Sequence, residues 1–149
     1  MTAMLAIGDL VAVGDLLTDL WFDVDHHDGV GVAELFVPEG SLTFDRATFT
    51  GQEEIRQVYR DRAAAGTRIS RHVLTNLRVR THGHDSAAVY SLMTLYADDG
   101  AFPSTAVTPV SVADVFDVVA RTTGGWAFRS RSLQTLFRDP GARLAVPTE

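Results

Sequence analysis

The C-terminal half of the chain constrains the fold most strongly, because four of its segments are rich in β-branched and aromatic residues. These segments span about 70–80, 86–97, 110–121 and 125–137, and turn-forming stretches (HGHD, DDGAFPST and TTGG) separate them. Strands that follow one another through short turns pair in antiparallel order. The sequence therefore predicts a four-stranded antiparallel meander.

The N-terminal end of the chain carries the periodicity of a helix instead. From Ile7 to about Asp25, apolar residues recur every three or four positions. This is the spacing of a helix with one buried stripe. A long amphipathic helix is therefore predicted there.

Three shorter elements are predicted between this helix and the meander. A short second helix is expected at 32–36, a short strand at 41–45, and a third helix at about 52–64. Thr50 and Glu53 have the spacing of a capping box, in which the two residues satisfy each other's backbone N–H groups at the start of a helix.

Helices followed by a run of long strands indicate an α+β fold, with three N-terminal helices packed on a curved, mainly antiparallel sheet. Such a sheet forms a cone whose concave side is a natural pocket for an apolar ligand. The 149 residues fit a single domain, 1–149, with a core from about 7 to 137 and a loosely held tail after Pro140.

Composition and charge narrow the function. Hydrophobic residues make up 46% of the chain, no apolar stretch approaches the ~20 residues of a membrane span, and the N-terminus lacks a basic segment. The net charge is −6 and the arginines are scattered, so the basic patch of a nucleic-acid-binding protein is missing. We expect a cytoplasmic protein that binds neither membranes nor nucleic acid and takes a small, largely uncharged ligand.

The chain lacks cysteine and lysine, which removes several kinds of chemistry. Thiolate nucleophiles, thiolate metal sites, Schiff bases with a pyridoxal cofactor and lysine-containing phosphate loops are all excluded. His82 and His84 form an HxH pair, but they lie in a turn with only Asp85 as a further ligand, so solvated side chains are favoured over a metal site. We expect neither a metal nor a cofactor.

Asp25 and His72 are the side chains best suited to acid/base chemistry. Asp25 projects from the edge of the buried helix stripe, where a carboxylate must be paired or desolvated, although it could instead cap the helix end. His72 opens the strand RHVLTNLRV and shares one face of it with Leu74 and Asn76. Counting apolar residues alone turns the opposite face, with Val73, inward and leaves His72 outside.

Five motifs in a fixed order resemble those of a known family. VDHHD, LFVPEG, FTGQEEI, SRHVLTN and GGWAFRSRSL, spread from about residue 10 to 137, look like the SnoaL-like subgroup of the NTF2-like superfamily. The resemblance implies a cone with a long N-terminal helix packed over a curved antiparallel sheet, commonly in a dimer or trimer. We therefore expect a homodimer or homotrimer.

The resemblance also implies a site. In the scytalone dehydratases of this superfamily, a catalytic aspartate lies late in the first helix and a catalytic histidine opens a strand; these positions match Asp25 and His72. The match turns His72 inward, against the apolar count, and brings both side chains into one cavity. Two tyrosines of those enzymes correspond approximately to Val24 and Phe44, and their second histidine to Ser91. The resemblance therefore supports the pair and not the substrate.

An aspartate–histidine pair has a definite chemistry. The histidine can take up and return a proton, while the buried aspartate orients its ring and stabilises its charged form. The sequence thus predicts a cofactor-independent acid/base enzyme, a dehydratase, isomerase or cyclase, acting on a small cyclic or polyketide-like molecule that is apolar or aromatic. Two alternatives stay open: a non-catalytic binding or assembly subunit, and an epoxide hydrolase of the limonene type, which needs an Asp/Arg/Asp arrangement.

Five further residues are candidates for binding the substrate. Asn76 could donate a hydrogen bond to an enolate oxygen, and Tyr90 or Tyr96 could turn a hydroxyl into the pocket. Trp21 and Phe44 could line it. Each of the five has a plainer alternative, either a polar residue in a strand or simple core packing.

Charged residues also fall on neighbouring predicted strands. Asp114 and Asp117 face opposite sides of one strand, and Arg129 and Arg131 lie on the next. We expect one of these aspartates to pair with one of these arginines across the sheet.

Overall fold

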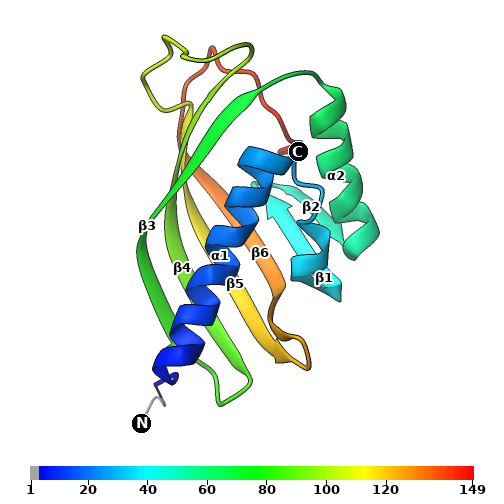
Figure 1. Ribbon diagram of the computed structural model, residues 1–149, viewed down its shortest axis with the longest axis vertical. Coiled ribbons are helices and arrows are strands. Elements are labelled where there is room, and N and C mark those ends of the chain that lie inside the picture. Colours follow the sequence, from blue (N-terminus) through cyan, green and yellow to red (C-terminus); the bar gives the residue numbers. More distant parts are fainter. Residues whose placement is uncertain (1–3) are drawn as a thin grey trace.

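The computed structural model describes residues 4–149 and contains one curved sheet with a long helix lying across its concave side (Figure 1). The elements, in chain order, are α1 (Ile7–His27), the 3₁₀ turn η1 (Ala33–Leu35), β1 (Phe36–Phe44), β2 (Ala47–Thr50), α2 (Gln52–Ala64), β3 (Ile69–Thr81), β4 (Ser86–Asp98), β5 (Ser111–Thr122) and β6 (Gly125–Arg138). Among the described residues, no helix is long and apolar enough to cross a membrane.

The six strands follow the order β2-β1-β6-β5-β4-β3. β3 to β6 form the predicted antiparallel meander. β1 pairs in parallel with β6, the last strand, and antiparallel with β2. The sheet is therefore mainly antiparallel, as predicted.

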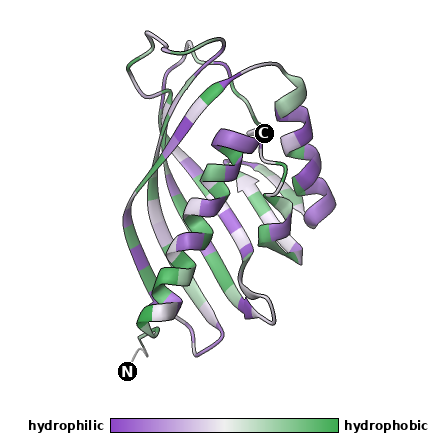
Figure 2. Ribbon diagram, viewed as in Figure 1, coloured by the Kyte–Doolittle hydropathy of each residue, from purple (hydrophilic) through white to green (hydrophobic). Residues whose placement is uncertain are grey.

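α1 packs on the sheet through one side. Figure 2 shows apolar and polar residues alternating along this helix, as expected for a helix with a single buried stripe. The buried side chains on that stripe are Val13, Leu16, Leu17, Leu20, Trp21 and Val24. The stripe ends one residue before Asp25, so this carboxylate lies where the helix leaves the core.

The described residues contain two α-helices, which corrects the prediction of three N-terminal helices. Residues 32–36 form only the turn η1, and Phe36 already belongs to β1. Phe36 explains the difference: its ring lies 5.1 Å from that of Phe128, opposite it on β6, and its carbonyl oxygen accepts a hydrogen bond from Gln52 Nε2 (2.8 Å). Tertiary contacts of this kind override local helix propensity.

The start of α2 also differs from the prediction, although its bounds are as predicted. Gly51 precedes the helix and no side chain caps it. The backbone N–H of Thr50 donates to the carboxylate of Glu54 (2.7 Å) rather than to that of Glu53. The predicted capping box is therefore wrong.

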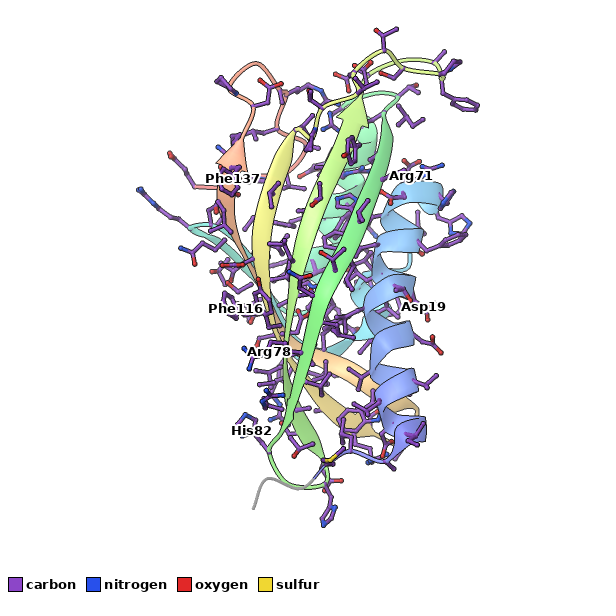
Figure 3. All side chains as sticks on the ribbon, turned by 90° about the vertical axis from the view of Figure 1, so that its left-hand side faces the viewer. Asp19, Arg71, Arg78, His82, Phe116 and Phe137 are labelled. Carbon is purple, nitrogen blue, oxygen red and sulfur yellow. The ribbon has the colours of Figure 1, made fainter. Side chains whose placement is uncertain are left out.

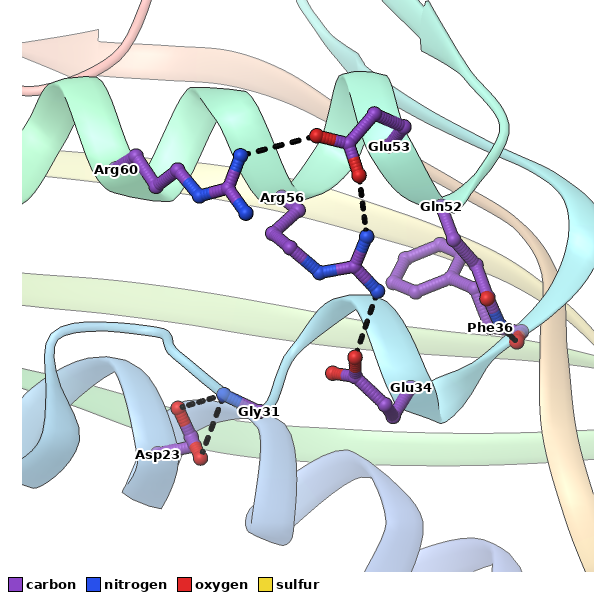
Figure 4. A network of polar contacts seen from close by, with 8 residues as sticks. All are labelled: Asp23, Gly31, Glu34, Phe36, Gln52, Glu53, Arg56 and Arg60. Atoms are coloured by element: carbon purple, nitrogen blue, oxygen red, sulfur yellow. Dashed lines mark hydrogen bonds and ion pairs between the residues drawn. The ribbon is translucent and has the colours of Figure 1, made fainter.

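Glu53 forms ion pairs with two arginines of α2 instead. Arg56 binds one oxygen of Glu53 (2.6 Å) and also reaches Glu34 of η1 (2.7 Å), while Arg60 binds the other oxygen of Glu53 (3.0 Å) (Figure 4). Exposed ion pairs of this kind stabilise a fold only slightly. Their consequence here is geometric, because they tie α2 to the turn that leads into β1.

Arg131 and Asp117 form an ion pair in the centre of the core. Both side chains are fully buried, with Nε to Oδ1 at 2.9 Å and Nη2 to Oδ2 at 3.1 Å. The predicted pairing between these two strands is thus confirmed for Asp117 and Arg131. The guanidinium carbon also lies 4.8 Å from the ring centres of both Trp21 and Phe128, so the charge is enclosed by aromatic rings.

Removing one partner of this pair should destabilise the fold strongly. Asp117→Asn leaves the Arg131 charge buried without a counter-ion, which costs about 3–5 kcal/mol in comparable cases. The free energy of unfolding, measured by chemical denaturation, should fall by that amount. Asp114→Asn is the matched control, because Asp114 lies on the same strand but accepts only a hydrogen bond from Tyr90 (2.8 Å). Equal losses in the two variants would contradict this account of the core.

Candidate active site

The concave side of the sheet holds a cavity of about 100 Å³ between α1, α2 and the C-terminal segment. Its walls are mostly apolar and come from α1, β1, β4, β5 and β6: Trp21, Val24, Phe44, Met93, Leu95, Ala113 and Leu133. Polar residues also line it. Tyr59 and Arg62 come from α2, Arg68 from the loop before β3, and Ser70 and His72 from β3. The others are Asp45, Ser111, Thr135, Arg138, Arg143 and Thr148. An apolar cavity with a few grouped polar side chains is the usual form of a ligand site.

The C-terminal segment closes one side of this cavity. Six residues between 142 and 148 line it, and Figure 1 shows the segment ending beside α1 and α2. Arg143 binds both oxygens of Asp99 (2.8 Å each), and the carbonyl oxygen of Thr148 accepts a hydrogen bond from the backbone N–H of Arg46 (3.1 Å). The tail that was predicted to be loosely held therefore forms a wall of the cavity.

Asp25 and His72 are in contact near the C-terminal end of α1. Nδ1 of His72 lies 2.6 Å from Oδ1 of Asp25, and the backbone N–H of His72 donates to Oδ2 (2.8 Å). The hydroxyl of Ser70 donates to Oδ1 (2.8 Å). Ser70 and His72 are two residues apart on β3 and so face the same side, which allows both to hold one carboxylate.

Trp21 holds the face of the His72 ring. The two rings are stacked with centres 4.1 Å apart and planes 2° from parallel. Trp21 precedes Asp25 by four residues, about one helical turn. The helix α1 therefore supplies both the carboxylate bonded to Nδ1 of His72 and the ring stacked on its imidazole. Among residues 4–149, Asp25 is the one hydrogen-bond partner of the ring, which leaves Nε2 free beside the cavity.

Burial and hydrogen bonding set the protonation of the pair. Burial lowers the pKa of His72 below its ordinary value of 6.5, and the Asp25 carboxylate offsets this only in part. Burial acts to raise the pKa of Asp25, but hydrogen bonds from His72 and Ser70 and the charge of His72 outweigh it, so this pKa is below 3.8. At neutral pH a carboxylate therefore lies beside a neutral imidazole. Since the carboxylate can only accept, Nδ1 carries the proton and Nε2 carries the lone pair.

Arg62 extends the pair into a network. Its Nη2 donates to Oγ of Ser70 (3.1 Å), and Ser70 donates in turn to Asp25. The positive charge of Arg62 is one of the influences that keep the pKa of His72 low. Arg62, Ser70, Asp25 and His72 thus form a continuous chain from α2 to the cavity.

A family model for the SnoaL-like domain matches residues 6–132. The chain belongs to this family. No protein of curated function matches the sequence.

Solved structures resemble the SnoaL-like domain over most of its length. A candidate scytalone dehydratase from Novosphingobium aromaticivorans has a TM-score of 0.78 at 17% identity, covering 94% of this chain and 92% of that one. ActVI-ORFA from Streptomyces coelicolor has a TM-score of 0.74 at 19% identity, with 86% and 97% covered. An NTF2-like protein with a cystatin-like fold from N. aromaticivorans has a TM-score of 0.70 at 21% identity, with 91% and 85% covered. These likenesses establish the shared NTF2-like fold.

Among the sequence candidates in the SnoaL-like domain, three line the cavity and a fourth, Asp25, contacts one of them. His72, Trp21 and Phe44 line it, and Asp25 contacts the His72 ring. Val73 is 42% exposed on the opposite face, so the apolar count, which turned Val73 inward, was wrong. The facing implied by the family resemblance is the observed one.

Asn76 lies outside the cavity because β3 contains a bulge. The register with β4 shifts between Thr75 and Arg78, and Asn76 has a left-handed backbone with φ of 57°. The extra residue interrupts the alternation that would have placed Asn76 on the same face as His72. Asn76 is exposed and does not line the cavity, which corrects its predicted role.

Tyr90 and Tyr96 are also outside it, on the outer face of the sheet. Tyr90 donates to Asp114 (2.8 Å) and packs on Phe116, and Tyr96 is 40% exposed. On β4 the buried residues Ser91 and Met93 face inward, so the tyrosines at even positions face outward. The expectation that one of them turns a hydroxyl into the pocket is corrected.

Sequence reasoning missed Tyr59, Arg62 and Ser70. Tyr59 and Arg62 lie on the buried stripe of α2 with Ile55 and Val58. The three-and-four spacing of these residues was visible, but it does not say that the stripe borders a cavity. As for metals, no group of three or more His, Asp or Glu side chains within the described part of the chain is placed to hold one.

The protonation of the pair can be checked by NMR. The ring signals of His72, assigned by their loss in His72→Gln, should titrate with a midpoint below pH 6.5. In Asp25→Asn the midpoint should fall further, because the carboxylate that favours the charged ring is gone. Asp23→Asn, which alters a carboxylate bound to Gly31 (3.1 Å) instead, should leave the midpoint unchanged. A midpoint above 6.5 in the unaltered protein would contradict the assignment.

Proposed function

We propose that this SnoaL-like domain is a cofactor-independent acid/base enzyme, a dehydratase, isomerase or cyclase that acts on a small cyclic or polyketide-like molecule. The observation that carries the proposal is the 2.6 Å contact between Asp25 and His72, with the ring stacked on Trp21 and Nε2 free beside an apolar cavity. A base held in one tautomer and one orientation is what proton transfer at carbon requires.

In the proposed mechanism, Nε2 of His72 takes a proton from a carbon next to a carbonyl group. The C–H electron pair becomes a C=C bond as the carbonyl electrons move to oxygen, and Asp25 stabilises the imidazolium that forms. The proton then returns to another carbon in an isomerisation, or goes to a leaving hydroxyl that departs as water in a dehydration. In a cyclisation the enolate carbon attacks a second carbonyl, whose oxygen takes the proton.

The cavity also bears on the size of the ligand. Ligand pockets usually measure about 300–1,000 Å³, whereas this one measures about 100 Å³. A single compact ring is the natural occupant of that space. A larger polyketide-like molecule would need the segment between residues 142 and 148 to shift.

Replacing the pair tests the proposal. His72→Ala and Asp25→Asn should lower turnover of the most active member of a panel of cyclic, polyketide-like and steroid-like ketones by about 100-fold or more, the contribution of a general base. The rate of the unaltered enzyme should fall as the pH is lowered through the pKa of His72, below 6.5, because only the neutral ring accepts a proton. His82→Ala, in an exposed turn, is the control. Unchanged turnover in both site variants would rule the dyad out.

Two other functions are compatible with the sequence. A non-catalytic assembly subunit would copurify stoichiometrically with a large catalytic subunit from its native cell, and the paired, pKa-shifted histidine favours the enzyme over this role. The limonene-type epoxide hydrolase needs an Asp/Arg/Asp set. Within residues 4–149, Arg131 binds one carboxylate, that of Asp117, and both are sealed in the core.

We propose further that the outer face of the sheet binds a second copy of the chain. Phe116 and Phe137, 49% and 70% exposed, project from this face, away from α1 (Figure 3). Exposed aromatic residues grouped on one face mark interaction sites. Phe116→Glu should shift the mass measured by light scattering from a dimer or trimer to a monomer, whereas Phe22→Glu, an exposed position on α1, should not. An unaltered protein that is monomeric at micromolar concentration would refute this proposal.

A further inference from the structure

Tyr59 faces the cavity with an unused hydroxyl. The residue is only 3% exposed, and its hydroxyl has no hydrogen-bond partner among residues 4–149. It is not one of the sealed polar atoms of the core, which in this part of the chain are Trp21 Nε1, Ser91 Oγ and Arg131 Nη1. Burial raises the pKa of Tyr59 to about 12, so the hydroxyl stays protonated and can donate.

Arg62 lies three residues further along α2 and faces the same cavity. It is 8% exposed, and its one hydrogen bond in the described structure goes to the neutral Ser70 (3.1 Å). Arg56 and Arg60 on the same helix pair with Glu53, whereas no carboxylate within residues 4–149 lies at ion-pair distance from Arg62. Most of its five N–H donors are therefore free, and a buried guanidinium gains most from an anionic partner.

We propose that Tyr59 and Arg62 form an oxyanion site, which holds the carbonyl oxygen of an enolisable cyclic ketone while His72 acts on the neighbouring C–H bond. This inference rests on the proposed function, because proton removal by His72 creates the negative charge. The two donors come from one turn of α2, the base comes from β3, and all three residues line the same cavity. The substrate class that fits is a compact ring, otherwise apolar, with one carbonyl group.

The step is balanced. The C–H bond next to the carbonyl breaks and its proton forms a new N–H bond at Nε2 of His72. The C–H electron pair forms the C=C bond of the enolate, and the former C=O pair becomes a lone pair on oxygen. Tyr59 and Arg62 donate hydrogen bonds to this oxygen, which carries more charge in the transition state than in the ketone, so their effect on the rate is selective for the transition state.

A planar phenolate tests the site without knowledge of the substrate. 4-Nitrophenolate carries a conjugated anionic oxygen on one ring and resembles an enolate, whereas nitrobenzene has the ring without that oxygen. The full chain should bind 4-nitrophenolate more tightly than nitrobenzene in absorbance titrations. Tyr59→Phe and Arg62→Gln should each weaken nitrophenolate binding by about tenfold or more, as expected for a lost hydrogen bond to a charged group, and leave nitrobenzene binding unchanged.

Matched controls exist for both variants. Tyr90→Phe removes a hydroxyl on the outer face, and Arg60→Gln removes an arginine from the exposed side of α2; both should bind the phenolate normally. Tyr59→Phe deletes an atom without a protein partner and should fold normally by circular dichroism, so it decides the matter alone if Arg62→Gln does not fold.

The outcomes separate this inference from the proposed function. His72→Gln should keep tight phenolate binding while losing turnover, and normal turnover in that variant would count against the base, not the oxyanion site. The oxyanion site is overturned if Tyr59→Phe binds 4-nitrophenolate as tightly as the unaltered protein. It is also overturned if the unaltered protein does not prefer the phenolate to nitrobenzene.

Discussion

The buried ion pair between Asp117 and Arg131 is the contact on which the site depends. Burying either charge without the other would cost several kcal/mol, about 3–5 in comparable cases. The ion pair therefore favours the register of β5 and β6 in which Asp117 lies opposite Arg131. The guanidinium fixed there lies 4.8 Å from the Trp21 ring, and Trp21 stacks on His72 at 4.1 Å. The stack of the Arg131 guanidinium, the Trp21 ring and the His72 ring therefore helps to orient the imidazole. This stacking holds the His72 ring although, within the described residues, it has one hydrogen bond, to Asp25.

Charge balance links this core to the cavity. Asp25 is an anion at neutral pH and His72 is neutral, so the carboxylate needs another positive partner; Arg62 supplies one through the Ser70 hydroxyl. Two carboxylates and two guanidinium groups therefore offset one another around one histidine. Under the proposed function, proton uptake by His72 adds a positive charge at the moment when the substrate oxygen becomes negative. The interior then remains balanced throughout the step.

The sequence predicted the elements that are decided by their own residues. α2 spans Gln52–Ala64 as predicted, and each of the four long strands begins and ends within one residue of its prediction. The predictions were wrong where contacts with residues distant in the sequence determine the local structure. Phe36 enters a strand because Phe128 lies opposite, and the bulge at Asn76 reverses the facing of β3, which no alternation pattern reveals. Asp25 and His72 were singled out because the order of motifs, unlike periodicity, carries information about distant contacts.

The two tyrosines of the scytalone dehydratases have no counterpart at the matching positions of this chain. At the positions that the resemblance matched to catalytic tyrosines, Val24 and Phe44 are apolar walls of the cavity. A base that removes a proton from carbon still needs a donor for the oxygen that becomes charged, since an enolate in an apolar cavity is otherwise unfavourable. Tyr59 and Arg62 are donors on the same lining, supplied by α2 rather than by α1 and β1. Under the proposed function, α1 and β3 hold the base, whereas α2 supplies the donors for the oxygen. The position of these donors then decides where the carbonyl group of the substrate lies.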